Sequence, residues 1–155
     1  MFYQMARMTG LRRQELMQLV WGDIHLDGDT PSIQLRADTT KSKRADSVPL
    51  HGGLASDLRS LRKDAGSNDR IFRSNPSIAS HWGWIKKAGI ASKDDRGCRA
   101  DFHALRKTFG TSLGVAGISQ ITRMACMRHT DSRLTDNTYT DGRLLGTHAA
   151  VQGLP

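Results

Sequence analysis

Three short strand-forming segments lie close together near the start of a chain whose other periodic segments are helical. Segments 24–26, 32–36 and 47–50 are separated by turn-forming residues at 27–29 and 41–43. So small a sheet is marginal by itself and has to pack against helices. The sequence therefore predicts a mainly α domain of the α+β kind, with one small three-stranded antiparallel sheet near its N-terminus.

Apolar residues at helical spacing predict the elements around this sheet. Leu54, Leu58 and Leu61 fall at i, i+4 and i+7 and indicate an amphipathic helix over 51–65. Similar spacing predicts helices over 11–20, 77–88, 101–115, 118–127 and 131–139, with a last short one over 143–152. The first eight residues look like the last turns of an apolar helix, so we expect one domain, residues 1–155, that is truncated at its start.

The charge balance favours an anionic partner. The chain has 23 Lys and Arg against 15 Asp and Glu, a net charge of +8. Nucleic acid is the usual partner of so basic a chain, although a merely soluble basic protein fits the charge alone equally well. Cys98 and Cys126 have no disulfide or metal spacing, and no stretch has the ~20 apolar residues of a membrane span. We expect a cytoplasmic protein with reduced thiols.

Two pairs of side chains are suited to binding a phosphodiester. His103 and Arg106 are three residues apart, so one helix face presents both. A guanidinium binds two phosphate oxygens, and an imidazole moves a proton near neutral pH. Arg12 can be oriented by Glu15 in the same i, i+3 relation. Taken alone, each pair is equally an ordinary ion pair or a solvated helix face.

Three further residues complete a set of candidates for phosphoryl transfer. Lys41 lies between two predicted strands, His129 precedes a predicted helix, and Tyr139 follows it. The ordinary alternatives are a solvated turn lysine, a capping histidine and a half-buried tyrosine. Phosphoryl transfer without a metal needs a nucleophile, cations and an acid, and this set supplies all three. The sequence has no cluster of acidic and His residues at metal-ligand spacing, so we expect no metal and no cofactor.

Five segments together resemble the tyrosine recombinases, or phage integrase family, in the order in which that family carries them. The resemblance runs from Thr9 to about Asp141. Its boxes are Thr9-Gly10-Leu11-Arg12-Arg13-Gln14-Glu15-Leu16 with Trp21-Gly22-Asp23-Ile24, Thr40-Lys41-Ser42-Lys43 through Val48-Pro49-Leu50, Phe102-His103-Ala104-Leu105-Arg106, Met127-Arg128-His129-Thr130 and Thr138-Tyr139-Thr140.

The resemblance implies a catalytic domain of the DNA breaking–rejoining type and a role for each matching residue. Tyr139 would attack the scissile phosphate and form a 3′-phosphotyrosyl link. Arg12 and Arg106 would hold the non-bridging oxygens, and Lys41 would protonate the leaving 5′ oxygen. His103 would be the base and His129 a donor to the phosphate. Glu15 would support Arg12, and the DNA-binding set would be Arg13, Lys43, Arg44, Lys107 and Arg128.

The resemblance also implies partners and leaves alternatives open. Full-length members act on double-stranded DNA as tetramers, and segment 143–151 would be exchanged between subunits. Lys107 stands where many members carry His, and the N-terminal DNA-clamping domain is missing from this chain. The leading hypothesis is a site-specific recombinase that integrates or excises DNA. A catalytically inactive DNA-binding remnant of a mobile element is the alternative, and a relaxing topoisomerase fits the boxes less well.

Overall fold

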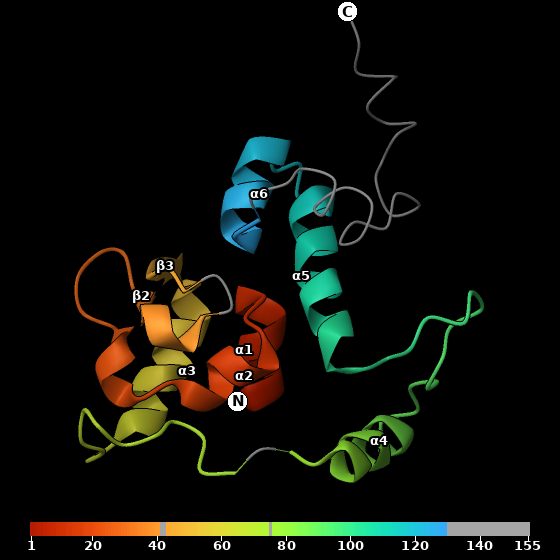
Figure 1. Ribbon diagram of the computed structural model, residues 1–155, viewed down its shortest axis with the longest axis horizontal. Helices are drawn as coiled ribbons and strands as arrows, with labels where there is room; N and C mark the ends of the chain where they lie inside the picture. Colours follow the sequence, from red (N-terminus) through yellow and green to blue (C-terminus); the bar gives the residue numbers. More distant parts are fainter. Residues whose placement is uncertain (41–42, 75, 130–155) are drawn as a thin grey trace, which may run out of the picture.

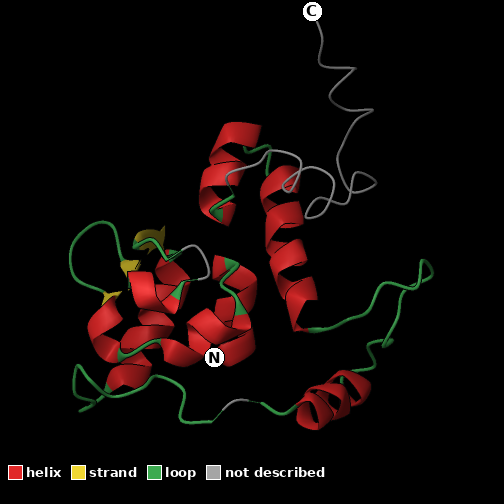
Figure 2. Cartoon of the chain, in the orientation of Figure 1, coloured by secondary structure: helices red, strands yellow, loops and turns green. Residues whose placement is uncertain are grey.

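The computed structural model describes residues 1–40, 43–74 and 76–129 (Figure 1). In chain order the elements are α1 (Phe2–Thr9), α2 (Arg13–Gln18), η1 (Trp21–Asp23), β1 (Ile24–His25), β2 (Ser32–Leu35), η2 (Ala37–Thr39), β3 (Asp46–Pro49), α3 (Gly52–Arg62), α4 (Ile78–Lys87), α5 (Phe102–Val115) and α6 (Gln120–Met127). Helices dominate and the strands form one small patch (Figure 2). The predicted helices over 131–139 and 143–152 lie outside the described residues.

The three strands form one antiparallel sheet in the order β1-β2-β3. Ile33 pairs with Ile24 on one side and Val48 on the other. These three side chains are buried on the same face, whereas Gln34 and Ser47 face outward and bond each other. The alternation places one apolar face against the helices, as the sequence predicts. The mainly α fold with a small sheet is confirmed.

A single apolar core joins the sheet to the N-terminal helices and α3. Its fully buried side chains include Met5 of α1, Leu16 of α2 and Leu54 and Leu58 of α3. Leu61, predicted to belong to the same face, is 42% exposed because α3 ends at Arg62, at the edge of the core. The core therefore fixes α1, α2, the sheet and α3 as one body.

The sharp break between α1 and α2 depends on Gly10. Gly10 has φ +63°, a left-handed conformation that glycine adopts without the penalty of a side chain. A Cβ at this position would also lie 2.5 Å from the Phe109 ring of α5. Gly10 therefore allows the chain to turn and α5 to approach α1, beside which it lies in Figure 1.

Helix α4 lies apart from the other helices (Figure 1), and partly buried hydrogen bonds connect it to the rest of the chain. The Tyr3 hydroxyl lies 3.1 Å from His81 Nδ1, and His81 Nε2 lies 2.9 Å from the Ala100 carbonyl oxygen. A carbonyl only accepts, so Nε2 carries the proton and Nδ1 accepts from Tyr3. The Arg13 guanidinium also donates to the Pro76 carbonyl (2.6 Å), directly before α4.

Candidate active site

Arg106, on the second turn of α5, is a buried charged residue of the candidate set, with 2% of it exposed, as is Glu15. Its Nη1 donates to the Gly10 carbonyl, and its Nη2 donates to the Met127 carbonyl. Nη2 also lies 3.0 Å from His129 Nε2. One guanidinium thus connects the α1–α2 break, α5 and the end of α6.

His129 is a neutral imidazole in this arrangement. Burial lowers its pKa from 6.5 to about 4, and the charges of Arg106, Arg12 and Arg128 act in the same direction. Because a guanidinium only donates, His129 Nε2 accepts the hydrogen bond from Arg106. The proton of the neutral ring is therefore on Nδ1.

His103 is the exposed member of the set, one turn before Arg106 on α5. Partial burial of its ring nonetheless lowers the pKa of His103, and nearby Arg106, Lys107 and Arg12 lower it further, whereas Asp101 opposes them. The ring is therefore mainly neutral at pH 7, the state that a proton acceptor requires.

Glu15 is a buried carboxylate that two arginines share. Its Oε1 accepts from Arg12 Nη1 at 3.0 Å, and its Oε2 accepts from the Arg12 backbone N–H at 2.8 Å. The predicted Arg12–Glu15 pair is therefore confirmed. Oε2 also accepts from Arg128 Nη2 at 2.6 Å, across 113 residues of sequence. Burial raises the pKa of Glu15, but Arg128 and Arg12 outweigh it, so the pKa is lowered and the carboxylate is charged.

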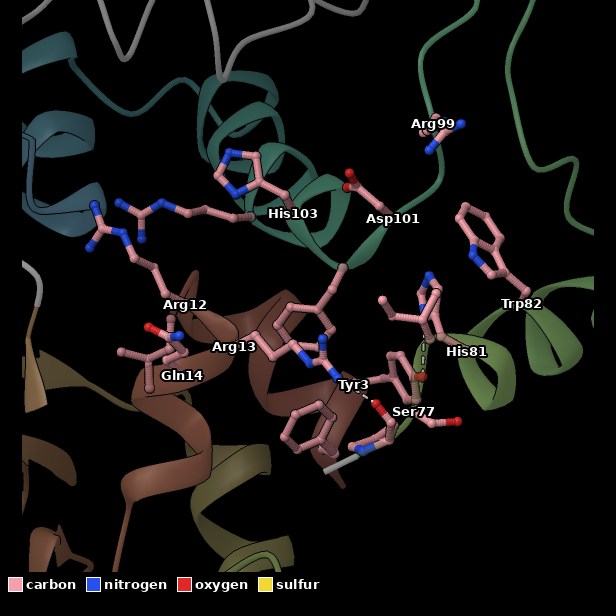
Figure 3. A pocket seen from close by; sticks show the side chains of 16 residues that line it. Tyr3, Arg12, Arg13, Gln14, Ser77, His81, Trp82, Arg99, Asp101 and His103 are labelled. Atoms are coloured by element: carbon pink, nitrogen blue, oxygen red, sulfur yellow. Dashed lines mark hydrogen bonds between the residues drawn. The ribbon is translucent and has the colours of Figure 1, made fainter. Parts of the chain in front are cut away.

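Arg12 faces a pocket of about 480 Å³ that opens beside this cluster. The Arg12 side chain is 35% exposed, and only one of its donors is used by Glu15 through a side-chain contact. Figure 3 shows Arg12 and His103 at one end of the pocket and His81 and Trp82 at the other, with Tyr3 between. The pocket thus presents arginines and the His103 imidazole at one end and aromatic rings at the other.

The predicted site residues divide into those the structure gathers and those it does not. Arg12, Glu15, His103, Arg106 and His129 come together from three distant segments. Lys41 and Tyr139 lie outside the described residues.

The predicted DNA-binding set is dispersed. Lys43 and Arg44 are exposed next to β3, and Lys107 is exposed on α5. Arg13 bonds Pro76 and Arg128 bonds Glu15, and the Arg128 side chain is only 9% exposed. Sequence reasoning missed the Arg128–Glu15 pair, because no local spacing signals a contact between residues so far apart.

Two structural absences apply to the described part of the chain. Within residues 1–40, 43–74 and 76–129, no three His, Cys, Asp or Glu side chains gather in a way that could hold a metal ion. Within the same ranges no helix combines the length and the apolar character needed to cross a membrane.

Solved structures with a similar fold include two recombinases and the catalytic domain of an integrase. The chain matches XerH site-specific recombinase bound to its palindromic difH substrate with a TM-score of 0.70 and 20% identity, over 99% of this chain and 45% of that one. It matches the catalytic domain of bacteriophage HP1 integrase with a TM-score of 0.66 and 21% identity, over 99% of this chain and 80% of that one. It matches XerA recombinase with a TM-score of 0.65 and 23% identity, over 97% of this chain and 55% of that one.

Those identities show a shared fold, and this chain spans less than half of the XerH protein. No curated protein sequence matches the chain closely enough to count as a relative. The sequence model of the Phage integrase family matches residues 1–143, which include all five boxes. The chain therefore belongs to the phage integrase family, the tyrosine recombinases.

Proposed function

We propose that this chain cleaves and rejoins double-stranded DNA at a specific site, as a tyrosine recombinase. The observation that carries the proposal is the convergence of Arg12, Arg106, His103 and His129 beside one pocket, although these residues come from three separate segments. Two arginines can stabilise the negative charge of a phosphodiester in the transition state, and two neutral imidazoles can accept protons or hydrogen bonds there. The net charge of +8 and the XerH structure with bound DNA substrate support DNA as the partner.

Arg12 and Arg106 bind the non-bridging oxygens of the scissile phosphate in this proposal. Arg106 is held from behind by two backbone carbonyls, so its orientation is set before DNA arrives. A phosphate oxygen then competes with His129 for Arg106 Nη2. His129 carries its proton on Nδ1 while Nε2 accepts from Arg106, so phosphate binding releases Nε2, which donates to the phosphate once the ring takes up a proton there, a change that the negative phosphate favours.

The covalent step uses two residues outside the described part of the chain, and it rests on the sequence resemblance. The Tyr139 hydroxyl oxygen bonds to phosphorus as the bond from phosphorus to the 5′ oxygen breaks, which gives a 3′-phosphotyrosyl link. The phenolic proton passes to His103, and Lys41 protonates the departing 5′ oxygen. Reversal by another strand's 5′-hydroxyl rejoins DNA without a metal or ATP.

The wider assembly is also a proposal. Residues 1–155 form one catalytic domain, whose exposed Lys43, Arg44 and Lys107, with Arg13, contact the DNA backbone. The active form is a tetramer on DNA in the full-length protein, with segment 143–151 exchanged between subunits. Bacterial or phage DNA lies in the cytoplasm, so the reaction takes place there.

A suicide DNA substrate tests the proposal. The protein is incubated with nicked candidate sites that trap the intermediate, and a denaturant-resistant protein–DNA adduct is expected with this chain and not with Tyr139→Phe. DNA affinity should fall steeply as salt rises, since bound Lys and Arg release counterions. DNA binding without an adduct on any site would favour the inactive remnant, and affinity that ignores salt would remove DNA as the partner.

A further inference from the structure

Arg128 occupies a position that an arginine side chain disfavours. It caps the C-terminus of α6 with φ 54° and ψ 45°, in the left-handed region where glycine is the usual residue. Its side chain is nonetheless only 9% exposed and reaches Glu15 at 2.6 Å. A residue that keeps an unfavourable backbone conformation and a buried charge is held by its surroundings.

Hydrogen bonds hold the residues on both sides of Arg128. Arg106 donates to the Met127 carbonyl before it and contacts His129 Nε2 after it. Arg128 itself bonds the carboxylate that also holds Arg12 through two hydrogen bonds. A continuous chain of contacts therefore runs from His129 through Arg128 and Glu15 to Arg12.

We propose that Arg128 is a positioning residue whose ion pair with Glu15 fixes Arg12 relative to His129. This inference rests on the proposed function and replaces DNA contact as the role of Arg128. The guanidinium is directed inward at Glu15, and its side chain is too buried to follow a DNA backbone. Without the pair, Arg106 alone holds the segment that carries His129, so this segment is freer to move away from Arg12 and into solvent.

Arg128→Gly isolates the guanidinium, because glycine keeps the left-handed cap without strain. At saturating protein on a suicide substrate, the rate constant for adduct formation should fall about 10²-fold, the scale expected from loss of alignment. DNA affinity, measured in the Tyr139→Phe background, and its salt dependence should stay as they are. Arg128→Lys retains a cation for Glu15 and should recover part of the rate.

A phosphate contact by Arg128 predicts the opposite pattern. Arg128→Gly would then weaken DNA binding and reduce the salt slope by about one, at an unchanged saturating rate. Either that pattern or no change in rate would overturn the inference. Arg96→Gly is the matched control, since Arg96 forms an exposed pair with Asp94 at 3.4 Å and should alter none of these quantities.

A DNA-free measurement separates this inference from the proposed function. In Glu15→Gln, loss of a negative charge alone would lower the pKa of His129, whereas release of the segment exposes the ring and raises the pKa. We expect an NMR titration to show a rise from about 4 toward 6.5, with Asp94→Asn as the unaffected control. An unchanged or lower pKa would overturn the inference whether or not the protein forms an adduct. A missing adduct together with a raised pKa would reject only the proposed function.

Discussion

Replacing Arg106 by Met tests whether the buried guanidinium holds the two halves of the site together. Methionine fills much of the same volume and donates no hydrogen bond, so the carbonyls of Gly10 and Met127 lose their donor in a site where only 2% of the side chain is exposed. Each buried carbonyl left without a donor costs about 1–3 kcal/mol. Relief from burying a charge offsets part of that sum.

The net loss should be about 3 kcal/mol of the free energy of unfolding, which for a domain of this size lowers the melting temperature by about 6–12 °C. Thermal and urea unfolding followed by circular dichroism measure it. Arg36→Met is the control, because Arg36 also donates to a carbonyl, that of Gln18, but its side chain is 47% exposed. The control should lose no more than about 1 kcal/mol. Equal losses in the two variants would refute the reasoning.

Three further predictions concern the stability of the helices around the site and the protonation of His129. Gly10→Ala should lower the free energy of unfolding, measured in urea, by more than about 1 kcal/mol, because it combines a left-handed alanine with a Cβ 2.5 Å from the Phe109 ring. Gly28→Ala is the control for backbone strain alone, since Gly28 has φ +81° and a Cβ there would meet no atom within 4 Å. Asp101→Ala should cost about 1 kcal/mol, because Asp101 caps α5 by accepting from the Ala104 N–H at 3.0 Å, while Asp101→Asn should retain most of the cap in the same assay. The free energy of unfolding should fall as the pH drops from 6.5 to 4, because the pKa of His129 is lowered in the folded protein and only the unfolded chain binds the extra proton in this range. In His129→Gln the free energy of unfolding should depend less steeply on pH, and an unchanged dependence would contradict a lowered pKa of His129.

The sheet could be predicted from the sequence almost to the residue. The turn-forming residues at 27–29 and 41–43 limit where each strand can run, and the observed strands differ from the predicted ones by a single residue at their ends. The segment 37–39 was not predicted and forms the short η2, whose turn Thr39 closes by donating to the Arg36 carbonyl.

The site could be predicted only in part. The Arg12–Glu15 pair follows from i, i+3 spacing, and the structure confirms it. The contacts of Arg106 with Gly10 and of Arg128 with Glu15 span 96 and 113 residues, and nothing local in either sequence segment signals them. Arg128 illustrates the limit well. Its positive charge suggested DNA, whereas its partner is a buried carboxylate that only the tertiary fold brings near.

These two long-range arginine contacts have a consequence for how the protein is made. A nascent chain that has emerged as far as the sheet already contains Arg12 and Glu15, but it has neither Arg106 nor Arg128. The cation cluster can form only after α5 and α6 have been synthesised and docked on the N-terminal helices. The complete cluster is therefore acquired late in synthesis, once the chain as far as α6 has been made.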